Sequence, residues 1–350
     1  MKTIKDFNVD GKRVLVRCDF NVPLDERGNI LDDFRIRETV PTIEYLVQEK
    51  AKIILISHLG RPEGKVVEKL RLNPVAKKLS DLLGRSVKKL NDCVGKEVEN
   101  AILEMQPCDI ILLENIQFNP GENKKDLNFV KTLAGYADIF ILEAFGQSHR
   151  DYASITGIQD YLPSAAGFLL EKEITILTNL IENPKRPLVS IIGGKKVETK
   201  EKLIDTISRM SDVVLIGGLI EKEIKERGIK LQYPDKIIFP LDEIGGGKDI
   251  GEKTIKLFKE KIGQAKTIFW NGPFGKIEEE EFQKGTKEIA KAIIESGAFS
   301  VVGGGETVEF IDKLGIGDKF NHISTGGGAM LDFICDGSLI GIDLLKNERN

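Results

Sequence analysis

The segment RVLVRCDFN, residues 13–21, shows the pattern from which the fold can be derived. Its apolar run, VLV, is followed closely by two polar residues, Asp19 and Asn21. Runs of the same kind recur at residues 52–56, 109–113 and 138–142, with the cores IILI, IILL and IFIL. Short continuous apolar runs of this length predict strands that are buried on both faces.

Helical patterns lie between these runs, at residues 41–49 and 73–83. The rhythm starts again after Pro187, with apolar runs at residues 188–192, 213–216, 236–239, 267–270 and 300–302. Alternation of strands and helices predicts parallel sheets that are covered by helices. Two successive sets therefore predict an α/β protein with two doubly wound, Rossmann-like parallel-sheet domains.

The stretch GFLLEKEITILTNLIEN, residues 167–183, has apolar residues at helical spacing and ends before Pro184. We expect it to form one helix that joins the domains. The predicted division is residues 1–166 for the N-terminal domain, 167–184 for the helix, 185–338 for the C-terminal domain and 339–350 for a tail. The GGGK segment at residues 245–248 is interpreted as a flexible surface loop or the remnant of a longer segment.

Composition excludes several classes of protein. The net charge of −4 over 350 residues gives no general attraction to nucleic acid. No apolar run approaches the roughly 20 residues of a membrane helix, and the N-terminus lacks the apolar region of a signal peptide. Four cysteines without CxxC spacing and three histidines do not indicate a zinc site. We therefore expect a cytoplasmic protein with free thiols and no membrane partner.

Polar residues after the strands of the first half mark one candidate site, because ligands bind beyond the carboxyl ends of parallel strands. Arg35, Arg61 and Arg150 are expected to converge there with His58. The planar fork of arginine donates two parallel hydrogen bonds to a phosphate, so this set predicts an anion site. A single arginine of this kind would more simply pair with a surface carboxylate. The other candidates at these strand ends are Asp19, Asn21, Glu114, Asn115, Gln117, Glu143 and His149.

The second half carries glycine clusters at its strand ends instead. Glycine lets backbone amides approach a phosphate closely, and a following helix N-terminus favours the anion. No P-loop is present, and no GxGxxG follows the first strand, which disfavours P-loop nucleotidases and simple Rossmann dehydrogenases. The clusters are GGKK at 193–196, GG at 217–218, NGP at 271–273, GGGET at 303–307 and TGGG at 325–328.

Four motifs in chain order give this chain a resemblance to the phosphoglycerate kinase family. They are VRCDFNVPL at 16–24, SHLGRP at 57–62, WNGP at 270–273 and STGGGA at 324–329, and the likeness extends from about residue 12 to about residue 344. The resemblance implies two domains that face each other across a cleft. It also implies reversible phosphoryl transfer from 1,3-bisphosphoglycerate to ADP, giving 3-phosphoglycerate and ATP, with Mg²⁺ on the nucleotide. We further expect a monomer whose partners are these small molecules.

The resemblance also implies roles for individual residues. Arg35 and Lys196 would be catalytic, one from each domain. Phosphoglycerate would be bound by Asp19, Asn21, Arg35, His58, Arg61, Gln117 and Arg150. Nucleotide would be bound by Lys196, Lys200, Asn271, Glu278, Gly303, Gly304, Gly305, Glu306 and Thr307, with Glu306 also holding the magnesium ion. The tail at 341–345 looks like the segment that returns to the first domain.

Several ligand positions depart from the family pattern. The pattern ENLRF reads ENIQF here, so Gln117 stands in place of an arginine, and NDAFG reads LEAFG with Glu143 as its acid. Glu306 replaces an aspartate, GGGMA reads GGLIE at 217–221, and the chain is short between about residues 230 and 266. Two alternatives stay open: a related carboxylate kinase with another substrate, and a non-catalytic nucleotide- or metabolite-binding regulator. Retention of Arg35, Lys196, Lys200 and an acid at 306 disfavours the regulator.

Overall fold

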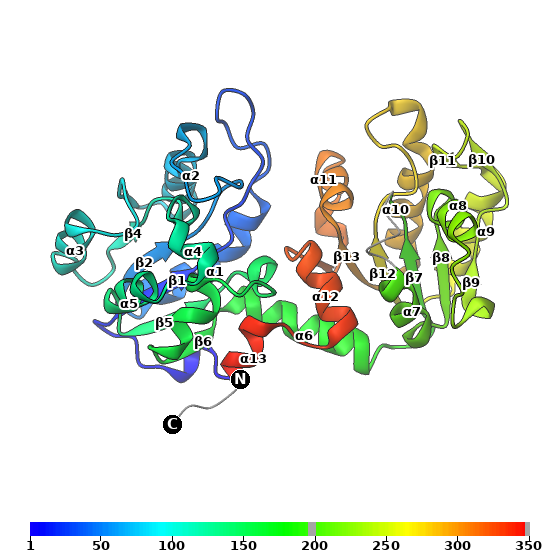
Figure 1. Cartoon of the computed structure of the whole chain (residues 1–350). Coiled ribbons are helices and arrows are strands. Elements are labelled where there is room, and N and C mark those ends of the chain that lie inside the picture. The colour runs from blue at the N-terminus through cyan, green and yellow to red at the C-terminus, as the bar shows by residue number, and fades with distance from the viewer. Residues whose placement is uncertain (195–200, 347–350) are drawn as a thin grey trace. The chain divides into compact units, whose positions relative to one another are not determined.

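The computed structural model describes residues 1–194 and 201–346. The chain forms two compact units (Figure 1). Unit 1 comprises Met1–Ile174 and Ser338–Asn350, and unit 2 comprises Thr175–Gly337. Helix α6, Phe168–Glu182, contains the point at which unit 1 passes into unit 2.

Unit 1 is built on a six-stranded sheet in the order β3-β4-β2-β1-β5-β6, and every neighbouring pair is parallel. The strands are β1 (Arg13–Arg17), β2 (Lys52–Ile56), β3 (Lys88–Lys89), β4 (Ile110–Leu112), β5 (Ile139–Leu142) and β6 (Ser164–Ala166). The flanking helices are α1 (Phe34–Gln48), α2 (Asn73–Leu83), α3 (Lys96–Leu103), α4 (Pro120–Lys124), α5 (Leu127–Gly135) and α13 (Ile340–Lys346). The central strands β1 and β2 are buried on both faces, which explains their unbroken apolar runs.

Unit 2 repeats this plan with the strand order β14-β13-β12-β7-β8-β9, again parallel throughout. Its strands are β7 (Leu188–Ile192), β8 (Val213–Ile216), β9 (Ile237–Ile238), β12 (Thr267–Asn271), β13 (Phe299–Gly303) and β14 (His322–Ile323). Strands β10 (Glu243–Ile244) and β11 (Asp249–Ile250) form a separate antiparallel pair. The helices are α7 (Glu201–Met210), α8 (Gly218–Arg227), α9 (Glu252–Gly263), α10 (Lys284–Ser296), α11 (Gly305–Lys313) and α12 (Gly328–Asp336).

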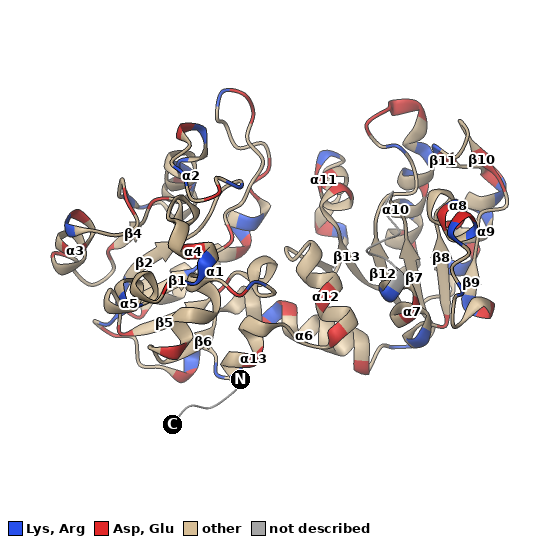
Figure 2. Ribbon diagram, in the orientation of Figure 1, with Lys and Arg blue, Asp and Glu red and all other residues tan. Residues whose placement is uncertain are grey.

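The two units have separate apolar cores. In unit 1 the core includes Val14, Ile53 and Ile141, and in unit 2 it includes Ile191 and Trp270. Most Lys, Arg, Asp and Glu lie on the helices and loops, while the sheets are largely free of them (Figure 2). The two parallel α/β units confirm the predicted fold class.

The predicted helix at residues 41–49 was wrong at its start, because α1 begins at Phe34. Proline is favoured in the first turn of a helix and disfavoured in its interior. Instead Pro41 lies inside the helix. The buried face runs through Ile36, Ile43 and Leu46, so packing of this face outweighs the backbone hydrogen bond that proline lacks. Arg35 therefore lies in the first turn of α1 and not in the preceding loop.

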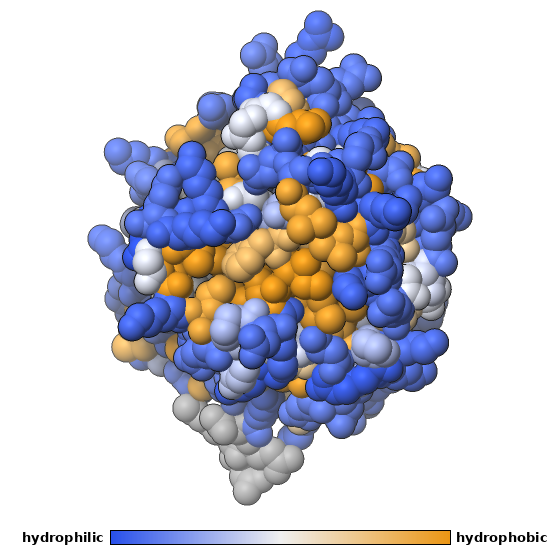
Figure 3. Space-filling model, turned by 90° about the vertical axis from the view of Figure 1, so that its right-hand side faces the viewer, coloured by the Kyte–Doolittle hydropathy of each residue, from blue (hydrophilic) through white to orange (hydrophobic). Residues whose placement is uncertain are grey.

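The side of unit 2 that carries β9 has an apolar area surrounded by hydrophilic residues (Figure 3). Strand β9 is an edge strand that pairs with β8. The large apolar side chains exposed in this part of the chain are Leu219, Leu241 and Ile244. In the described part of the chain, no helix is long and apolar enough to cross a membrane.

Candidate functional site

Four of the substrate residues predicted in unit 1 come together at the carboxyl ends of β1 and β2: Asp19, Asn21, Arg35 and His58. These strands pair in parallel with Arg17 opposite Ile56, so the residues that follow them emerge at the same edge of the sheet. His58 Nδ1 lies 3.9 Å from Asp19 Oδ1, and both side chains are buried. Asn21 joins them, because its Oδ1 accepts a hydrogen bond from the Gly60 amide at 2.8 Å.

Arg35 approaches the same cluster from the first turn of α1. Its Nη1 donates to the Asn21 carbonyl oxygen at 2.8 Å and lies 3.9 Å from Asp19 Oδ2. The Arg35 side chain is 29% exposed, whereas that of Asp19 is 5% exposed. Nη1 of the guanidinium is thus held by the protein, and the partly exposed side chain has further donors with which to bind an anion.

Two downward pKa shifts describe the electrostatics of this cluster. Burial acts to raise the pKa of Asp19, but the charge of Arg35, the neighbouring His58 and the charge of Arg17 together outweigh it and hold that pKa below its usual value. Burial lowers the pKa of His58 to about 3, aided by Arg17, Arg35 and Arg61 and opposed by Asp19. At neutral pH the site therefore contains an ionised Asp19 and a neutral His58.

The remaining substrate candidates have different settings. Arg61 is exposed and adds positive charge at His58. The Gln117 side chain is buried, and its backbone carbonyl oxygen accepts a hydrogen bond from the Gly64 amide at 3.1 Å. Arg150 is exposed in the turn after Phe145–Gln147. Two other strand-end acids have structural partners: Glu114 accepts from Arg71, and Glu143 accepts from the first amides of α6.

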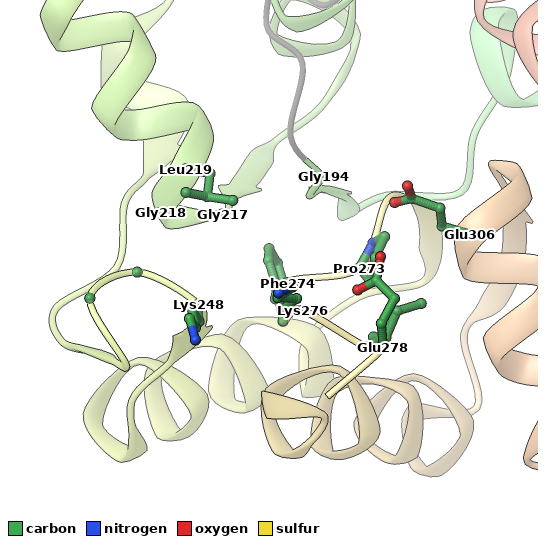
Figure 4. Close-up of a pocket in the computed structure, with 14 residues that line it drawn as sticks. Gly194, Gly217, Gly218, Leu219, Lys248, Pro273, Phe274, Lys276, Glu278 and Glu306 are labelled. Atoms are coloured by element: carbon green, nitrogen blue, oxygen red, sulfur yellow. The ribbon is translucent and has the colours of Figure 1, made fainter. Parts of the chain in front are cut away.

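Unit 2 contains a pocket of about 570 Å³, part of which is open to solvent. Figure 4 shows Gly217, Gly218, Leu219 and Lys248 on one side of it and Glu278 and Glu306 on the other. Phe274 and Lys276 lie between these two sides (Figure 4). The pocket is lined by Gly194, Gly217–Leu219, Gly246–Lys248, Pro273–Glu278 and Glu306. This elongated arrangement can accommodate a small ligand with an apolar part and an anionic part.

Two glycines allow the strand ends β7 and β12 to approach closely beside this pocket. A Cβ atom on Gly193 would lie 2.3 Å from the Pro273 carbonyl oxygen. A Cβ atom on Gly272 would lie 2.2 Å from the Gly193 carbonyl oxygen, and Gly272 has a φ of +93°. Hydrogen bonds from Gly193 N to Asn271 O and from Gly194 N to Pro273 O, both 2.9 Å, lock the segments together. Only glycine fits both positions without moving backbone atoms.

We expect Gly272→Ala to damage this pocket. The new methyl group meets backbone atoms and the positive φ is strained, so we expect a loss of stability of about 2–4 kcal/mol and roughly ten-fold weaker binding of MgADP. Thermal unfolding and titration calorimetry measure both effects. Gly263→Ala is the matched control, because Gly263 ends α9 with nothing near its Cβ position. Equal stability and equal MgADP affinity in the two variants would contradict the role assigned to Gly272.

Glu306 is the residue best placed to hold a magnesium ion of a bound nucleotide. It lies in the first turn of α11, is exposed and lines the pocket. Within residues 1–194 and 201–346, no group of three or more His, Cys, Asp or Glu side chains could hold a metal ion. Mg²⁺ is commonly bound by one or two carboxylates together with substrate phosphates. Glu306, one of the two glutamates that line the pocket, could therefore hold a magnesium ion that arrives with a nucleotide.

The other nucleotide candidates of the described chain surround the ends of β12 and β13. Asn271 and Thr307 are buried, and the Thr307 hydroxyl accepts a hydrogen bond from the Gly272 amide at 3.0 Å. Gly304 lies against Asn271, since its Cβ would be 2.8 Å from Asn271 Nδ2. Gly303 ends β13 and Gly305 begins α11. Lys196 and Lys200, assigned to phosphoryl transfer and nucleotide binding by sequence, lie outside the described residues.

Sequence reasoning missed part of the pocket wall. Phe274 and Lys276 line the pocket directly after the NGP motif, and Lys248 lines it from the GGGK segment. The Lys248 ammonium lies 3.2 Å from Glu279 Oε2 and 4.6 Å from the centre of the Phe282 ring. Its charge is therefore paired, and its alkyl chain forms part of the pocket wall. GGGK is thus part of the pocket as well as a surface loop. The only sequence signal was the run of three glycines itself.

The model of one protein family, "Phosphoglycerate kinase", matches residues 4–231 and 228–336. A phosphoglycerate kinase of Borrelia garinii subsp. bavariensis is 44% identical over 391 residues, covering 99% of each chain. One of Dictyoglomus turgidum is 45% identical over 392 residues, covering 99% of this chain and 98% of the relative. These alignments are longer than the 350 residues of this chain, and the two matched stretches meet near the end of α8. The relatives therefore have residues that the chain lacks.

Two solved structures resemble the whole chain. Phosphoglycerate kinase from Pyrococcus horikoshii has a TM-score of 0.87 at 31% identity, covering 99% of this chain and 98% of that one. The enzyme from Coxiella burnetii has a TM-score of 0.83 at 33% identity, covering 98% of both chains. The similarity in sequence and in structure extends over nearly the full length of the chain. The chain belongs to the phosphoglycerate kinase family and is, by that membership, a phosphotransferase.

Proposed function

We propose that this protein transfers a phosphoryl group between ATP and the carboxylate of 3-phosphoglycerate, giving ADP and 1,3-bisphosphoglycerate, and that the reaction runs in both directions. When ATP is the donor, the bond from its γ-phosphorus to the ADP oxygen breaks. A bond from that phosphorus to a carboxylate oxygen forms. The observation that carries the proposal is the cluster of Asp19, Asn21, Arg35 and His58 at adjoining strand ends, in a chain of this family.

The unit 1 cluster is proposed to bind phosphoglycerate. The exposed part of the Arg35 guanidinium and the exposed Arg61 offer positive charge to its anionic groups. Asp19 is ionised and lies deeper, where it can orient Arg35 and accept a hydrogen bond from a substrate hydroxyl group. Arg150 is proposed to contact the phosphate from the turn after Phe145–Gln147. We also propose that the substrate-binding domain comprises residues 1–166 and the nucleotide-binding domain residues 185–338.

The proposed acceptor is a carboxylate, and transfer to a carboxylate does not require a general base in the site. A carboxylate is already ionised near neutral pH, so phosphoryl transfer to it needs no general base. His58, whose pKa lies at about 3, stays neutral under these conditions and is not proposed to exchange a proton. Catalysis then consists of positioning and of stabilising the negative charge on the group in transfer. Arg35 supplies that stabilisation from unit 1, and Lys196 is proposed to do so from unit 2.

The unit 2 pocket is proposed to bind ADP or ATP. Glu278 would accept hydrogen bonds from the ribose, while the apolar wall around Phe274 would contact the base. The glycine-rich strand ends near Gly194 and Gly304 would lie along the phosphates. A magnesium ion, when bound with the nucleotide and held by Glu306, would neutralise phosphate charge. Lys200 is proposed to contact the nucleotide phosphates.

Gln117 provides the test that separates this proposal from a kinase for another carboxylate. The Gln117→Arg variant should gain a charged contact to the substrate phosphate. We expect its apparent affinity for 3-phosphoglycerate to rise by roughly ten-fold, since such a hydrogen bond contributes about 1.5–3 kcal/mol. The measurement compares kcat/KM for 3-phosphoglycerate and for glycerate, which lacks the phosphate, at saturating MgATP.

The two outcomes of this comparison are distinct. The proposal predicts that the parent already prefers 3-phosphoglycerate and that the variant widens the preference. Better turnover of glycerate or another unphosphorylated carboxylate by the parent, together with no gain in the variant, would favour the related kinase. A buried guanidinium without a phosphate partner would also lower the stability of that variant.

A further inference from the structure

A buried polar cluster lies behind the phosphoglycerate site and connects to His58. Its members are Arg17 at the end of β1, Glu122 in α4 and Ser154 in the π-helix Ala153–Gly157. Arg17 Nε donates to the Ser154 hydroxyl oxygen at 2.7 Å. That hydroxyl donates to Glu122, and the Ser154 amide donates to the other Glu122 carboxylate oxygen at 3.0 Å. The three side chains are 0% exposed.

The charges of this cluster depend on one another. Burial lowers the pKa of Arg17, but Glu122 and Asp19 oppose that shift, and an arginine in this setting stays protonated. Burial raises the pKa of Glu122, and Arg17 together with the two bonds from Ser154 opposes it. Removal of one partner would leave the other as an uncompensated buried charge. The orientation of the Arg17 guanidinium is therefore fixed from the side away from the substrate.

The far end of that guanidinium meets His58. Arg17 Nη1 donates to the Cys18 carbonyl oxygen, and Nη2 lies 3.5 Å from His58 Nδ1. A guanidinium has donors only, so the ring nitrogen that faces it must be the acceptor. Asp19 Oδ1 would favour a proton on Nδ1, but it is more distant, at 3.9 Å. The other charged groups that act on His58 are Arg35 and Arg61, and both disfavour a second proton on the ring.

We propose that Arg17, held by Ser154 and Glu122, is a positioning residue that fixes His58 as the tautomer with its proton on Nε2. His58 then offers one N–H donor, and a phosphoglycerate oxygen is the acceptor that the site would bring to it. The assignment of the donor to the substrate rests on the function proposed above. The assignment of the tautomer does not rest on that function, because it follows from the buried geometry of the free protein.

The tautomer can be measured directly by ¹⁵N NMR of the imidazole rings. The chain has only three histidines, so His58→Gln identifies the signals of His58. In the parent we expect protonated Nε2 and unprotonated Nδ1 throughout pH 5–8. In Arg17→Lys and Glu122→Gln we expect a mixture of tautomers or a ring that titrates in that range. A parent with protonated Nδ1, or variants with the unchanged parent pattern, would overturn the proposal.

Ser154→Ala keeps the proposal testable if the charged variants do not fold. It removes one hydroxyl group and leaves both charges in place. We expect its KM for 3-phosphoglycerate to rise by about ten-fold, while its KM for MgATP stays within about two-fold of the parent. Ser80→Ala is the control, because its hydroxyl donates within α2 to Ala76 and its loss should change neither constant. Equal effects of Ser154→Ala on both KM values, with the parent tautomer retained, would overturn the positioning role.

The two proposals fail in different ways. A protein without activity on 3-phosphoglycerate whose His58 has the expected tautomer would contradict the proposed function and still support the role of Arg17. An active protein whose His58 carries its proton on Nδ1 would overturn the role of Arg17 and leave the proposed function standing.

Discussion

Arg35→Ala is expected to lower kcat for phosphoryl transfer by about 10²- to 10³-fold. The reason is that the charge of Arg35 stabilises the phosphoryl group in transfer more than it stabilises the bound substrates. The structure supports this role through two contacts: Arg35 is held by the Asn21 carbonyl oxygen at 2.8 Å and lies 3.9 Å from Asp19. The Arg35 side chain as a whole is partly exposed. Steady-state kinetics with 3-phosphoglycerate and MgATP at saturation measure the effect.

Arg37→Ala is the matched control for that experiment. Arg37 lies two residues further along α1 and pairs with Asp33 at 2.6 Å on the surface. An exposed ion pair of this kind contributes little, so the control should retain kcat and the melting temperature. Since Arg35 is the strongest of the charges that lower the pKa of Asp19, its removal should also bring that pKa upward. A kcat for Arg35→Ala within about three-fold of the parent would refute the catalytic role.

Glu143→Gln is expected to remove much of the pH dependence of stability between roughly pH 5 and pH 8. Glu143 is fully buried after β5 and accepts hydrogen bonds from Thr42 and from the Leu169 and Leu170 amides at 3.1 and 3.3 Å. Burial nevertheless raises its pKa to about 8. The Glu143 carboxyl group packs closely against Gly167, because a Cβ atom on Gly167 would lie 2.1 Å from Glu143 Oε2.

The sign of the effect follows from proton binding. Between the ordinary glutamate pKa and about 8, the native protein holds a proton on Glu143 that the unfolded chain has lost. The stability that this proton provides is complete below the ordinary pKa and is lost as the pH rises through about 8. We expect the free energy of unfolding to fall by a few kcal/mol more in the parent than in Glu143→Gln across this range.

Denaturant unfolding at several pH values measures that difference. Glu114→Gln is an informative control, because Glu114 is also buried but has Lys89 and Arg71 beside it. Burial acts to raise the pKa of Glu114, and these cations with the Leu72 and Asn115 amides outweigh it and lower that pKa. Glu114 should therefore stabilise the protein above its ordinary pKa, with the opposite sign. Identical pH profiles of the parent and Glu143→Gln would show that Glu143 titrates normally.

Much of the fold could be predicted from the sequence, because buried parallel strands give continuous apolar runs. The runs at 188–192 and 213–216 coincide with β7 and β8, and the helical pattern at 73–83 coincides with α2. The edge strands β3, β6 and β14 were not predicted, since they have two or three residues and no distinct apolar run. The start of α1 was misplaced because tertiary packing overrides the local preference of Pro41.

The site was only partly visible in the sequence. Residues directly after a strand, such as Asp19 and His58, could be placed because parallel strands end at one edge of the sheet. Lys248 could not, because the antiparallel pair β10–β11 brings it to the pocket from a segment without a strong pattern. The contact of Arg17 with Ser154 joins residues 137 apart in sequence, and only the folded chain reveals it.

The central claim is that a carboxylate accepts the phosphoryl group of ATP at this site, and ³¹P NMR of the reaction tests it most directly. The protein is mixed with MgATP and a large excess of 3-phosphoglycerate, because an acyl phosphate is a stronger phosphoryl donor than ATP and the equilibrium otherwise leaves little of it to detect. The signals of ATP, ADP and acyl phosphate are followed. We predict that ADP and an acyl phosphate appear together in equal amounts, and that added ADP drives the acyl phosphate back to ATP. ATP that is stable in this mixture, or that yields only ADP and inorganic phosphate without an acyl phosphate, would contradict the claim.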